Sequence, residues 1–240
     1  MIEKIRKKNI KIQGTVASQK KSLSIINQLL KTKFNYQFDW LGIPAIQFPN
    51  DMLIIQELIF KQKPKIIIEC GIGHGGMLIF YASILKLLNI KNFKVIGIDI
   101  FIPPDLRQRL SSHGKLSERL VLIEGDSTSS DTLSQLKELL GGSKKILVIL
   151  DSNHTHEHVL NELRTYAPLV GNGQYLICGD TIVEYMPPQD HVSRPWGPGN
   201  NPATAVKEFL SETDRFVVDD KIDQRLLLSC HPGGYFQVVK

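Results

Sequence analysis

The sequence predicts an α/β protein with an open, mostly parallel sheet and helices on both faces. From residue 65 onward, short apolar or β-branched runs alternate with helical patterns, as in parallel sheets with crossover helices. A glycine-rich stretch at 69–76 separates the first such run from a helix. With 240 residues, 42% hydrophobic and 22% charged, the chain can bury one sizeable core.

The elements follow in order along the chain. Strands are expected at 66–70, 94–99, 120–124, 146–151 and 174–179, and helices at 77–88, 104–112, 131–140 and 156–167. Asn201 and Pro202 are a typical N-cap and first residue for a helix at 203–211. Runs at 216–219, 226–229 and 235–239 lie close together, which predicts an antiparallel hairpin at the sheet edge. Helices near 18–32 and 51–61 should form a cap, so we expect an N-terminal basic helical extension (1–50) and a main domain (51–240).

Charge is unevenly distributed. The net charge is +5, but residues 1–33 carry +8 and residues 34–240 carry −3. This basic extension suits peripheral contact with an anionic membrane, although a solvated helix face explains most such runs. Aromatic residues suited to stacking on bases are absent there, so no nucleic-acid partner is expected.

Compartment and assembly can also be predicted. No apolar run of 18 residues and no apolar signal segment is found, so neither a membrane span nor secretion is expected. The cysteines Cys70, Cys178 and Cys230 are odd in number and far apart, as in a reducing cytoplasm. We also expect a homo-oligomer.

The glycine-rich turn predicts a nucleotide-like cofactor. Gly71, Gly73, His74 and Gly75 follow a buried strand and open a helix, where backbone N–H groups can approach a ligand closely. Glu69 would repel a pyrophosphate but suits a ligand with an ammonium and a sulfonium group. We therefore predict S-adenosylmethionine rather than NAD. The interval to the next strand-end acid is also longer than in the usual dinucleotide fingerprint.

Acidic residues recur where the predicted strands end. They are Glu69, Asp99, Asp126, Asp151 and Asp180. Any one of them has about an even chance of only capping the next helix, but ligands of open α/β sheets bind at this edge. Asp99 is placed for the ribose hydroxyls, Asp126 and Ser127 for the adenine amino group, and Asp151 is also expected beside the cofactor.

A catalytic group is predicted after the fourth strand. Asp151 and Asp180 could share one hard cation such as Mg²⁺, which prefers oxygen ligands. His154, three residues beyond Asp151, has a pKa suited to removing a proton. His156 and His158 more often belong to a helix surface, since they continue along the predicted helix. A zinc or iron site is the alternative, but side chains at alternate positions of a helix point in different directions.

The long connection 185–201 is expected to be a lid or binding loop, with a plain surface excursion as the alternative. Arg194 and Trp196 within it are predicted to shape the acceptor pocket.

Four motifs resemble the cephalosporin hydroxylase family. They are Asp-Ser-Asn-His-Thr-His-Glu-His (151–158), Leu-Arg-Thr-Tyr-Ala-Pro-Leu-Val (163–170), Arg-Pro-Trp-Gly-Pro-Gly-Asn-Asn-Pro (194–202) and Ile-Asp-Gln-Arg-Leu-Leu-Leu-Ser (222–229). The resemblance spans residues 35–239. It implies a Rossmann-like class I methyltransferase fold with a seven-stranded sheet, and a Mg²⁺-dependent O-methyltransferase similar to enzymes acting on rhamnosyl groups of glycolipids and on macrolide sugars. Asp151 and Asp180 would be metal ligands and His154 the general base.

One position departs from the family pattern. The family often has a carboxylate before the Asp-Thr pair of the fifth strand, where this chain has Gly179. Weaker metal binding is therefore expected, with Glu184 as an open candidate for compensation. The function predicted is methyl transfer from S-adenosylmethionine to a hydroxyl of a sugar, glycolipid or other small metabolite. A nicotinamide-dependent oxidoreductase and a non-catalytic cofactor-binding accessory protein are the alternatives.

Overall fold

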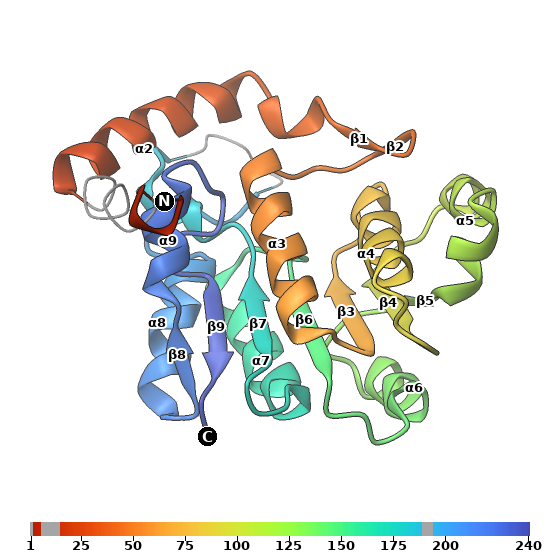
Figure 1. The fold of residues 1–240 in the computed structure, drawn as a ribbon. Coiled ribbons are helices and arrows are strands. Elements are labelled where there is room, and N and C mark those ends of the chain that lie inside the picture. The colour runs from red at the N-terminus through yellow and green to blue at the C-terminus, as the bar shows by residue number, and fades with distance from the viewer. Residues whose placement is uncertain (1, 6–14, 189–193) are drawn as a thin grey trace.

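A seven-stranded sheet forms the centre of the molecule (Figure 1). The computed structural model describes residues 2–5, 15–188 and 194–240. The strand order is β5-β4-β3-β6-β7-β9-β8. The strands are β3 (Ile66–Cys70), β4 (Lys94–Asp99), β5 (Leu120–Glu124), β6 (Ile146–Leu150), β7 (Tyr175–Cys178), β8 (Phe216–Val218) and β9 (Tyr235–Val238).

The pairing confirms the predicted mostly parallel, class I methyltransferase-like sheet. Strands β3 to β7 pair in parallel, and β9 is antiparallel to both β7 and β8. The central strand β3 is in register with both neighbours, with Cys70 opposite Ile98 of β4 and Leu150 of β6. The carboxyl ends of these strands therefore meet at one edge.

The strand expected at 226–229 was wrong. Helix α9 (Asp220–Leu226) covers the start of that run, and Leu227 turns the chain with a φ of 48°. Leu226 is buried against the core, whereas Leu228 packs in a separate cluster beside the N-terminal helix. The leucines of this run thus pack against two different clusters. Strands β8 and β9 form the predicted antiparallel pair at the sheet edge, and the chain between them contains α9.

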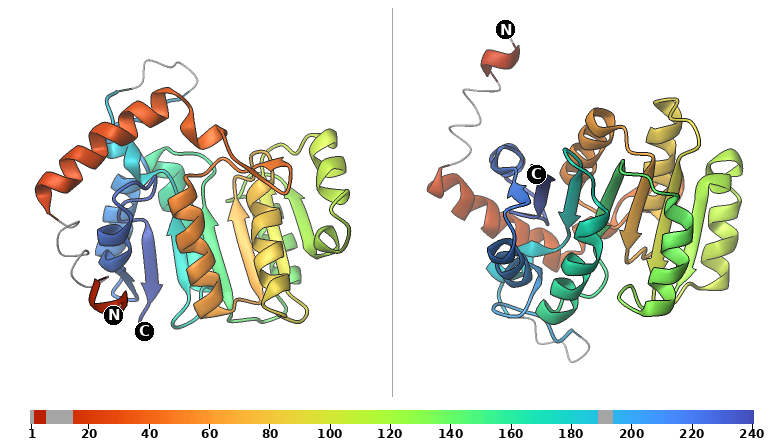
Figure 2. Two further views of the ribbon diagram at one scale, coloured as in Figure 1. Left: turned by 45° about the horizontal axis from the view of Figure 1, so that its top comes forward. Right: turned by 90° about the horizontal axis from the view of Figure 1, so that it is seen from below.

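Helices cover both faces of the sheet (Figure 2). On one side lie α3 (Pro49–Gln62), α4 (Gly76–Leu87) and α5 (Pro104–Ser111); on the other lie α6 (Ser130–Leu140), α7 (His156–Tyr166) and α8 (Pro202–Glu212). Short 3-10 turns are η1 (Phe34–Tyr36), η2 (Gly114–Arg119), η3 (Ala167–Leu169) and η4 (Thr181–Tyr185). Each predicted helix is found within two residues of its expected bounds. Asn201 caps α8 in a capping box with Thr204, as its sequence position indicated.

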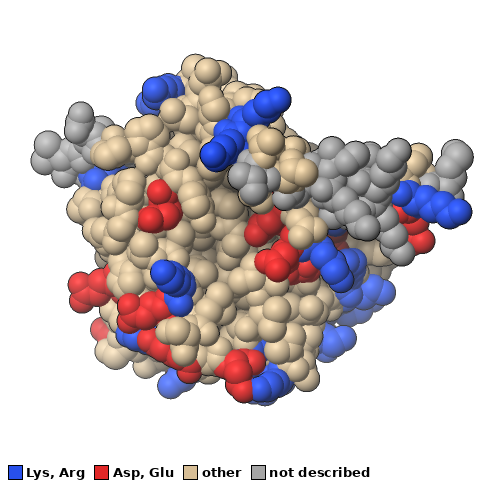
Figure 3. Space-filling model, turned by 90° about the vertical axis from the view of Figure 1, so that its left-hand side faces the viewer, with Lys and Arg blue, Asp and Glu red and all other residues tan. Residues whose placement is uncertain are grey.

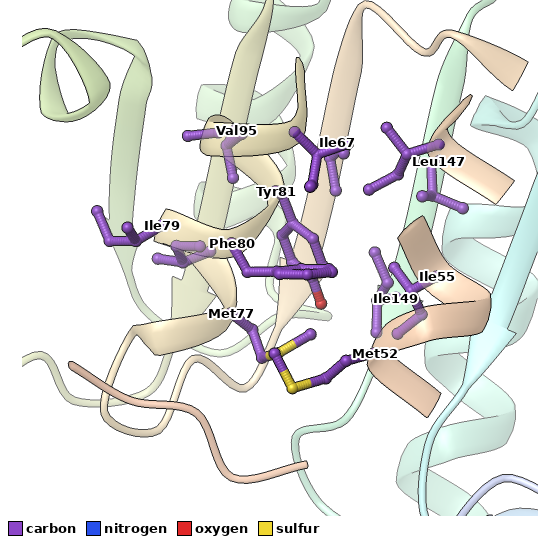
Figure 4. Close-up of a cluster of buried hydrophobic side chains, with 14 of the residues drawn as sticks. Met52, Ile55, Ile67, Met77, Ile79, Phe80, Tyr81, Val95, Leu147 and Ile149 are labelled. Carbon is purple, nitrogen blue, oxygen red and sulfur yellow. The ribbon is translucent and has the colours of Figure 1, made fainter. Parts of the chain in front are cut away.

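Alternation along the strands divides the core into two layers. Ile67, Leu147 and Ile149 face α3 and α4, while Ile66 and Val148 face α6 to α8. Figure 4 shows the first layer, in which side chains of both helices meet those of the strands. Each fully buried aliphatic side chain contributes roughly 1.5–3 kcal/mol to stability. Burial on both faces explains why these strands are continuous apolar runs.

The N-terminal segment crosses the carboxyl edge of the sheet. It consists of α2 (Val16–Lys31), η1, β1 (Asp39–Trp40) and β2 (Ile43–Pro44). Figure 1 shows α2 lying across the end at which the parallel strands finish. Only α2 fulfils the expected cap: α3 packs on a sheet face, because its apolar side covers Ile67 and Leu147. The domain boundary at residue 50, next to the start of α3, stays a prediction.

The basic extension lies only partly within the described residues. Residues 1 and 6–14 of the basic extension lie outside the described residues, so its contact with a membrane stays a prediction. On the face shown in Figure 3, acidic and basic side chains are interspersed over the described part of the chain. Within that part, no helix combines the length and apolar character needed to cross a bilayer.

Candidate active site

The carboxyl edge of the sheet carries the predicted row of acidic side chains. Glu69 is in β3, Asp99 ends β4, Asp151 directly follows β6, and Asp180 lies two residues beyond β7. Because β4, β3, β6 and β7 are consecutive in the sheet, these residues lie beside one another.

A cavity of about 510 Å³ lies over this edge. Most predicted site residues line it: Glu69, Gly71, Gly73, His74, Asp99, Asp151, His154, Asp180, Arg194 and Trp196. Gly75, Asp126 and Ser127 do not line it, and the α2–η1 segment, which was not predicted as part of the site, does.

The glycine turn brings β3 and β6 into close contact. Gly71 has a φ of 85°, and a Cβ there would lie 2.2 Å from the carbonyl oxygen of Asp151. Gly75, with a φ of 82°, is the N-cap of α4. Glycine is required at both positions, since L side chains rarely adopt such φ values. The turn thus brings backbone close to the cavity at its glycine positions.

Glu69 is a buried acid with one free oxygen. It is 3% exposed, and the Tyr81 hydroxyl donates to its Oε1 at 2.7 Å. Its Oε2 is also buried and has no hydrogen-bond partner among the described residues. Burial raises the pKa of Glu69 to about 8, although the hydrogen bond from Tyr81 opposes the shift. A cationic ligand group in the cavity would satisfy the free oxygen and favour the ionised form.

Asp99 is fixed at the end of β4. The backbone N–H of Ile72 donates to Oδ2 at 2.9 Å, and that of Phe101 donates to Oδ1 at 3.3 Å. Each carboxylate oxygen keeps capacity for a further donor. The next two residues, Ile100 and Phe101, are 71% and 63% exposed. They place apolar surface beside Asp99, a feature that the sequence analysis missed.

The structure places Asp126 and Ser127 beyond the cavity. Asp126 accepts from the N–H and hydroxyl of Thr128, and these bonds lower its pKa. Ser127 is buried and donates to Glu162, which also accepts from Ser152. The role of both residues at the adenine stays a prediction.

His158 belongs to the same buried cluster as Ser127. Its Nε2 lies 3.3 Å from Oγ of Ser127, 3.1 Å from Oγ of Ser152 and 3.3 Å from Oε1 of Glu162. The hydrogen bond with Glu162 raises the pKa of His158. Its side chain is partly buried inside the protein rather than on a plain helix surface. His156 lies at the α7–α8 contact, with Nδ1 2.8 Å from the Thr204 hydroxyl.

Asp151, His154 and Asp180 converge in the cavity. One possible ligand atom from each lies within 4.8 Å of the others. His154 Nε2 is 3.5 Å from Oδ2 of Asp180, and burial lowers the pKa of His154. Burial and then the Asp180 charge raise the pKa of Asp151. A cation would relieve the repulsion between the two carboxylates, so this donor set fits a divalent ion such as Mg²⁺.

The position of Asp151 leaves little space for a side chain at Gly179. A Cβ at Gly179 would lie 2.2 Å from Oδ1 of Asp151, so that carboxylate occupies the space of any side chain there. Glu184 does not compensate: it accepts from Gly199 N–H at 2.8 Å and from the Asn201 side chain. Glu184 therefore orders the loop before α8 instead of the metal site.

A hydrogen-bonded link supports both carboxylate positions. The N–H of Asp180 donates to His231 Nδ1 at 3.1 Å, so the ring proton lies on Nε2. His231 Nε2 is 3.1 Å from Gln47 Oε1, and Gln47 Nε2 donates to Asp151 Oδ2 at 3.1 Å. Gln47 and His231 are both buried. No motif connects residues 47 and 231, so sequence alone gave no signal for this link.

The described part of the 185–201 loop closes one side of the cavity. The Trp196 ring meets that of His154 edge to face, with centroids 4.9 Å apart. Arg194 also lines the cavity, near enough to contribute to the lowered pKa of His154. The loop therefore contacts the predicted base, as expected of a binding loop.

Comparison with known proteins identifies the family. The family model described as Rhamnosyl O-methyltransferase/CmcI matches residues 32–239. The chain belongs to this family. Its membership confirms the predicted resemblance and the expected class of enzyme, an O-methyltransferase. A hydroxylated acceptor is the corresponding substrate.

Two relatives of the Rhamnosyl O-methyltransferase/CmcI family are named as rhamnosyl O-methyltransferases. The protein of Mycobacterium bovis (strain BCG / Pasteur 1173P2) is 29% identical over 196 residues, covering 81% of this chain and 72% of the relative. The protein of Mycobacterium leprae (strain TN) is 31% identical over 152 residues, covering 62% of each chain.

Solved structures support the fold. A CmcI structure named with Mg and SAM has a TM-score of 0.60 at 20% identity, covering 85% of this chain and 78% of the other. TomG from Streptomyces achromogenes, in complex with SAM, has a TM-score of 0.54 at 16% identity, covering 91% and 90%. These matches confirm the class I methyltransferase fold, and their names carry the two cofactors that the sequence predicted.

Proposed function

We propose that the protein transfers a methyl group from S-adenosylmethionine to a hydroxyl of a sugar or another small hydroxylated metabolite. The observation that carries this proposal is the shared cavity. It joins the glycine turn and Glu69 to Asp151, His154 and Asp180. A cofactor held at the turn would therefore have its reactive end beside the acid–base group.

Four side chains suit the cofactor. Glu69 would bind the ammonium through its partnerless Oε2 and Asp99 would accept from the ribose hydroxyls. Ile100 and Phe101, exposed beside Asp99, offer apolar surface for the adenine.

The transfer needs a donor, a base and a positive charge near the acceptor. S-adenosylmethionine would supply the methyl group, and Mg²⁺ held by Asp151 and Asp180 would lower the pKa of the acceptor hydroxyl. His154 is kept neutral by its lowered pKa and would take the hydroxyl proton at Nε2. Asp180, 3.5 Å away, would stabilise the imidazolium that results. Trp196 packs on this ring and would exclude water.

A binding and turnover experiment tests the function. We expect S-adenosylhomocysteine to bind with a Kd in the micromolar range, on the order of −7 to −8 kcal/mol, and NAD not to bind. With labelled S-adenosylmethionine, Mg²⁺ and a panel of glycosides, label should pass to at least one acceptor. Binding of NAD alone would favour the oxidoreductase. Binding of S-adenosylhomocysteine without turnover on any acceptor would favour the accessory protein.

Assembly and location stay part of the proposal. We infer a cytoplasmic homo-oligomer, with membrane contact through the basic residues 1–33. Light scattering on the purified protein would show a single mass above 27.1 kDa for the oligomer. Co-sedimentation with anionic vesicles, lost at high salt, would support the membrane contact.

A further inference from the structure

Acidic and basic side chains both line the cavity. Its floor carries the acids of the strand ends, which the proposed cofactor and metal neutralise. Three cations also line the cavity: Lys31 ends α2, Lys33 follows it, and Arg194 comes from the loop before α8. No carboxylate from the α2–η1 segment or from the described part of that loop lines the cavity.

These cations have no acidic partner among the described residues. Arg107, Arg164 and Arg225 each form an ion pair with a glutamate, whereas Arg194 forms none. Lys31 makes no ion pair, and Lys33 Nζ lies 6.0 Å from the centre of the Tyr36 ring. The C-terminus of α2 favours a cation by itself, but it does not explain why Arg194, from a distant segment, faces the same space.

We propose that the acceptor is a negatively charged glycoside, whose phosphate or carboxylate is bound by Lys31, Lys33 and Arg194. This inference rests on the proposed methyl transfer and names its substrate class. The anion would lie under α2, while the reacting hydroxyl lies at His154. Lysine and arginine bind phosphate and carboxylate through charge-assisted hydrogen bonds, and a cation-lined entrance concentrates anions. These three cations would therefore set both the affinity for the acceptor and its orientation in the cavity.

The carboxylate of the cofactor is the rival partner for these cations. If it used them, neutralising the lysines would weaken cofactor binding rather than acceptor binding. The affinity for S-adenosylhomocysteine therefore separates the two interpretations.

The test compares acceptors that differ only in charge. Wild-type protein with S-adenosylmethionine and Mg²⁺ is offered a methyl hexoside, the hexose 1-phosphate and the hexuronate. A further arm presents the sugar phosphate as a lipid headgroup in neutral vesicles, which distinguishes a soluble source from a lipid source. We expect kcat/KM to favour an anionic acceptor over the methyl hexoside by about 10- to 100-fold, the worth of one charged hydrogen bond.

Charge-neutralising variants then locate the anion site. Lys31→Gln/Lys33→Gln and Arg194→Gln should each lose most of this preference, while the Kd of S-adenosylhomocysteine stays within about twofold. The matched control is Lys61→Gln/Lys63→Gln, a lysine pair around the end of α3 that does not line the cavity. Its preference should equal that of the wild type.

Two results would overturn the inference: equal use of neutral and anionic acceptors by the wild type, or a lysine variant that weakens only S-adenosylhomocysteine. Calorimetric binding of the sugar phosphates to the protein with S-adenosylhomocysteine is measured in parallel. If the sugar phosphates bind to the wild type but not to the lysine variant, the anion site is supported even if no methyl transfer is observed. If no anion binds, the inference fails while the proposed function survives on a neutral acceptor.

Discussion

Asp151 is the most constrained side chain of the candidate site. Its carbonyl oxygen packs where a Cβ of residue 71 would be, its Oδ1 occupies the space beside Gly179, and its Oδ2 accepts from Gln47. The carboxylate therefore has a defined orientation before any ligand binds. Keeping the carboxylate ionised in this orientation costs free energy, because burial and the charge of Asp180 both raise the pKa of Asp151.

His154 is the residue whose replacement tests the chemistry most directly. His154→Ala should lower kcat by at least about 100-fold at neutral pH, since a positioned base contributes 10²–10⁴-fold. The Kd of S-adenosylhomocysteine should change little, and higher pH should partly restore the rate. His156→Ala is the control, because that ring contacts Thr204 outside the cavity. A His154 variant with normal kcat and a lower Tm would assign the ring to packing.

The raised pKa of Glu69 predicts that the protein releases a proton when the cofactor binds. Its pKa of about 8 leaves it mostly protonated at pH 7, and a bound ammonium favours the ionised form. Binding of S-adenosylhomocysteine without metal at pH 7 should therefore release about one proton, and the affinity should rise toward pH 8 and then level. Calorimetry in buffers of different ionisation enthalpy measures this. Equal release by Glu69→Gln would place the proton on another group.

At the scale of elements, the site depends on segments that are distant in sequence. The turn before β9 supplies His231, and the loop before α3 supplies Gln47, so a C-terminal and an N-terminal element together hold the ends of β6 and β7. The partners of a metal ligand orient it and tune its basicity. Their loss should affect metal binding more than cofactor binding.

Gln47→Ala tests this support. The substitution leaves Asp151 Oδ2 and His231 Nε2 without their partner, so the Mg²⁺ concentration for half-maximal activity should rise by about 10- to 100-fold. Saturating Mg²⁺ should restore most of kcat, and the Kd of S-adenosylhomocysteine should be unchanged. Gln37→Ala, an exposed glutamine of the same segment, is the control. Loss of kcat that Mg²⁺ cannot restore would point to a different role for Gln47.

For some elements, the sequence pattern alone was sufficient to predict the structure. Strands buried on both faces are continuous apolar runs, so the parallel part of the sheet and its row of acids could be predicted. The run 226–229 has the same composition, but it is divided between α9 and the cluster beneath α2. A local pattern cannot reveal such a division, because it depends on which distant surface each leucine reaches.

At the scale of the molecule, the sheet carries the cofactor end of the site and the N-terminal segment covers it. The predicted acids that follow β4, β3, β6 and β7 lie together because these strands are consecutive in the sheet, whereas Asp126, which follows the edge strand β5, does not line the cavity. Gln47 and the α2–η1 lining were not predicted, since tertiary contact alone brings them to the cavity. His231 was not predicted either, since it reaches the site only through its contacts with Asp180 and Gln47. Gly179 was interpreted as a lost ligand, and in the structure the Asp151 carboxylate occupies the space in which a side chain at residue 179 would begin.

The complete enzyme should depend on a divalent metal. Excess chelator should abolish turnover, and Mg²⁺ or Mn²⁺ should restore it, because the carboxylates of Asp151 and Asp180 lie close enough to share one cation beside His154. Metal should also raise the Tm, since it binds only the folded site and relieves carboxylate repulsion. Initial rates and thermal melts with and without chelator are the measurements. Full activity under chelation would leave Asp151 a role other than metal binding.

The link between Gln47 and His231 also bears on how the protein is made. The two residues are 184 positions apart, so on the ribosome the first emerges long before the second is synthesised. A nascent chain can already pair β3, β4 and β6 at that stage, but the carboxylates at their ends have only half of their support. Strands that form during synthesis are thus present before the active site at their ends is complete. A chain that ended before residue 231 would lack His231 and also β9, the strand between β7 and β8, so both the active centre and the sheet would be incomplete.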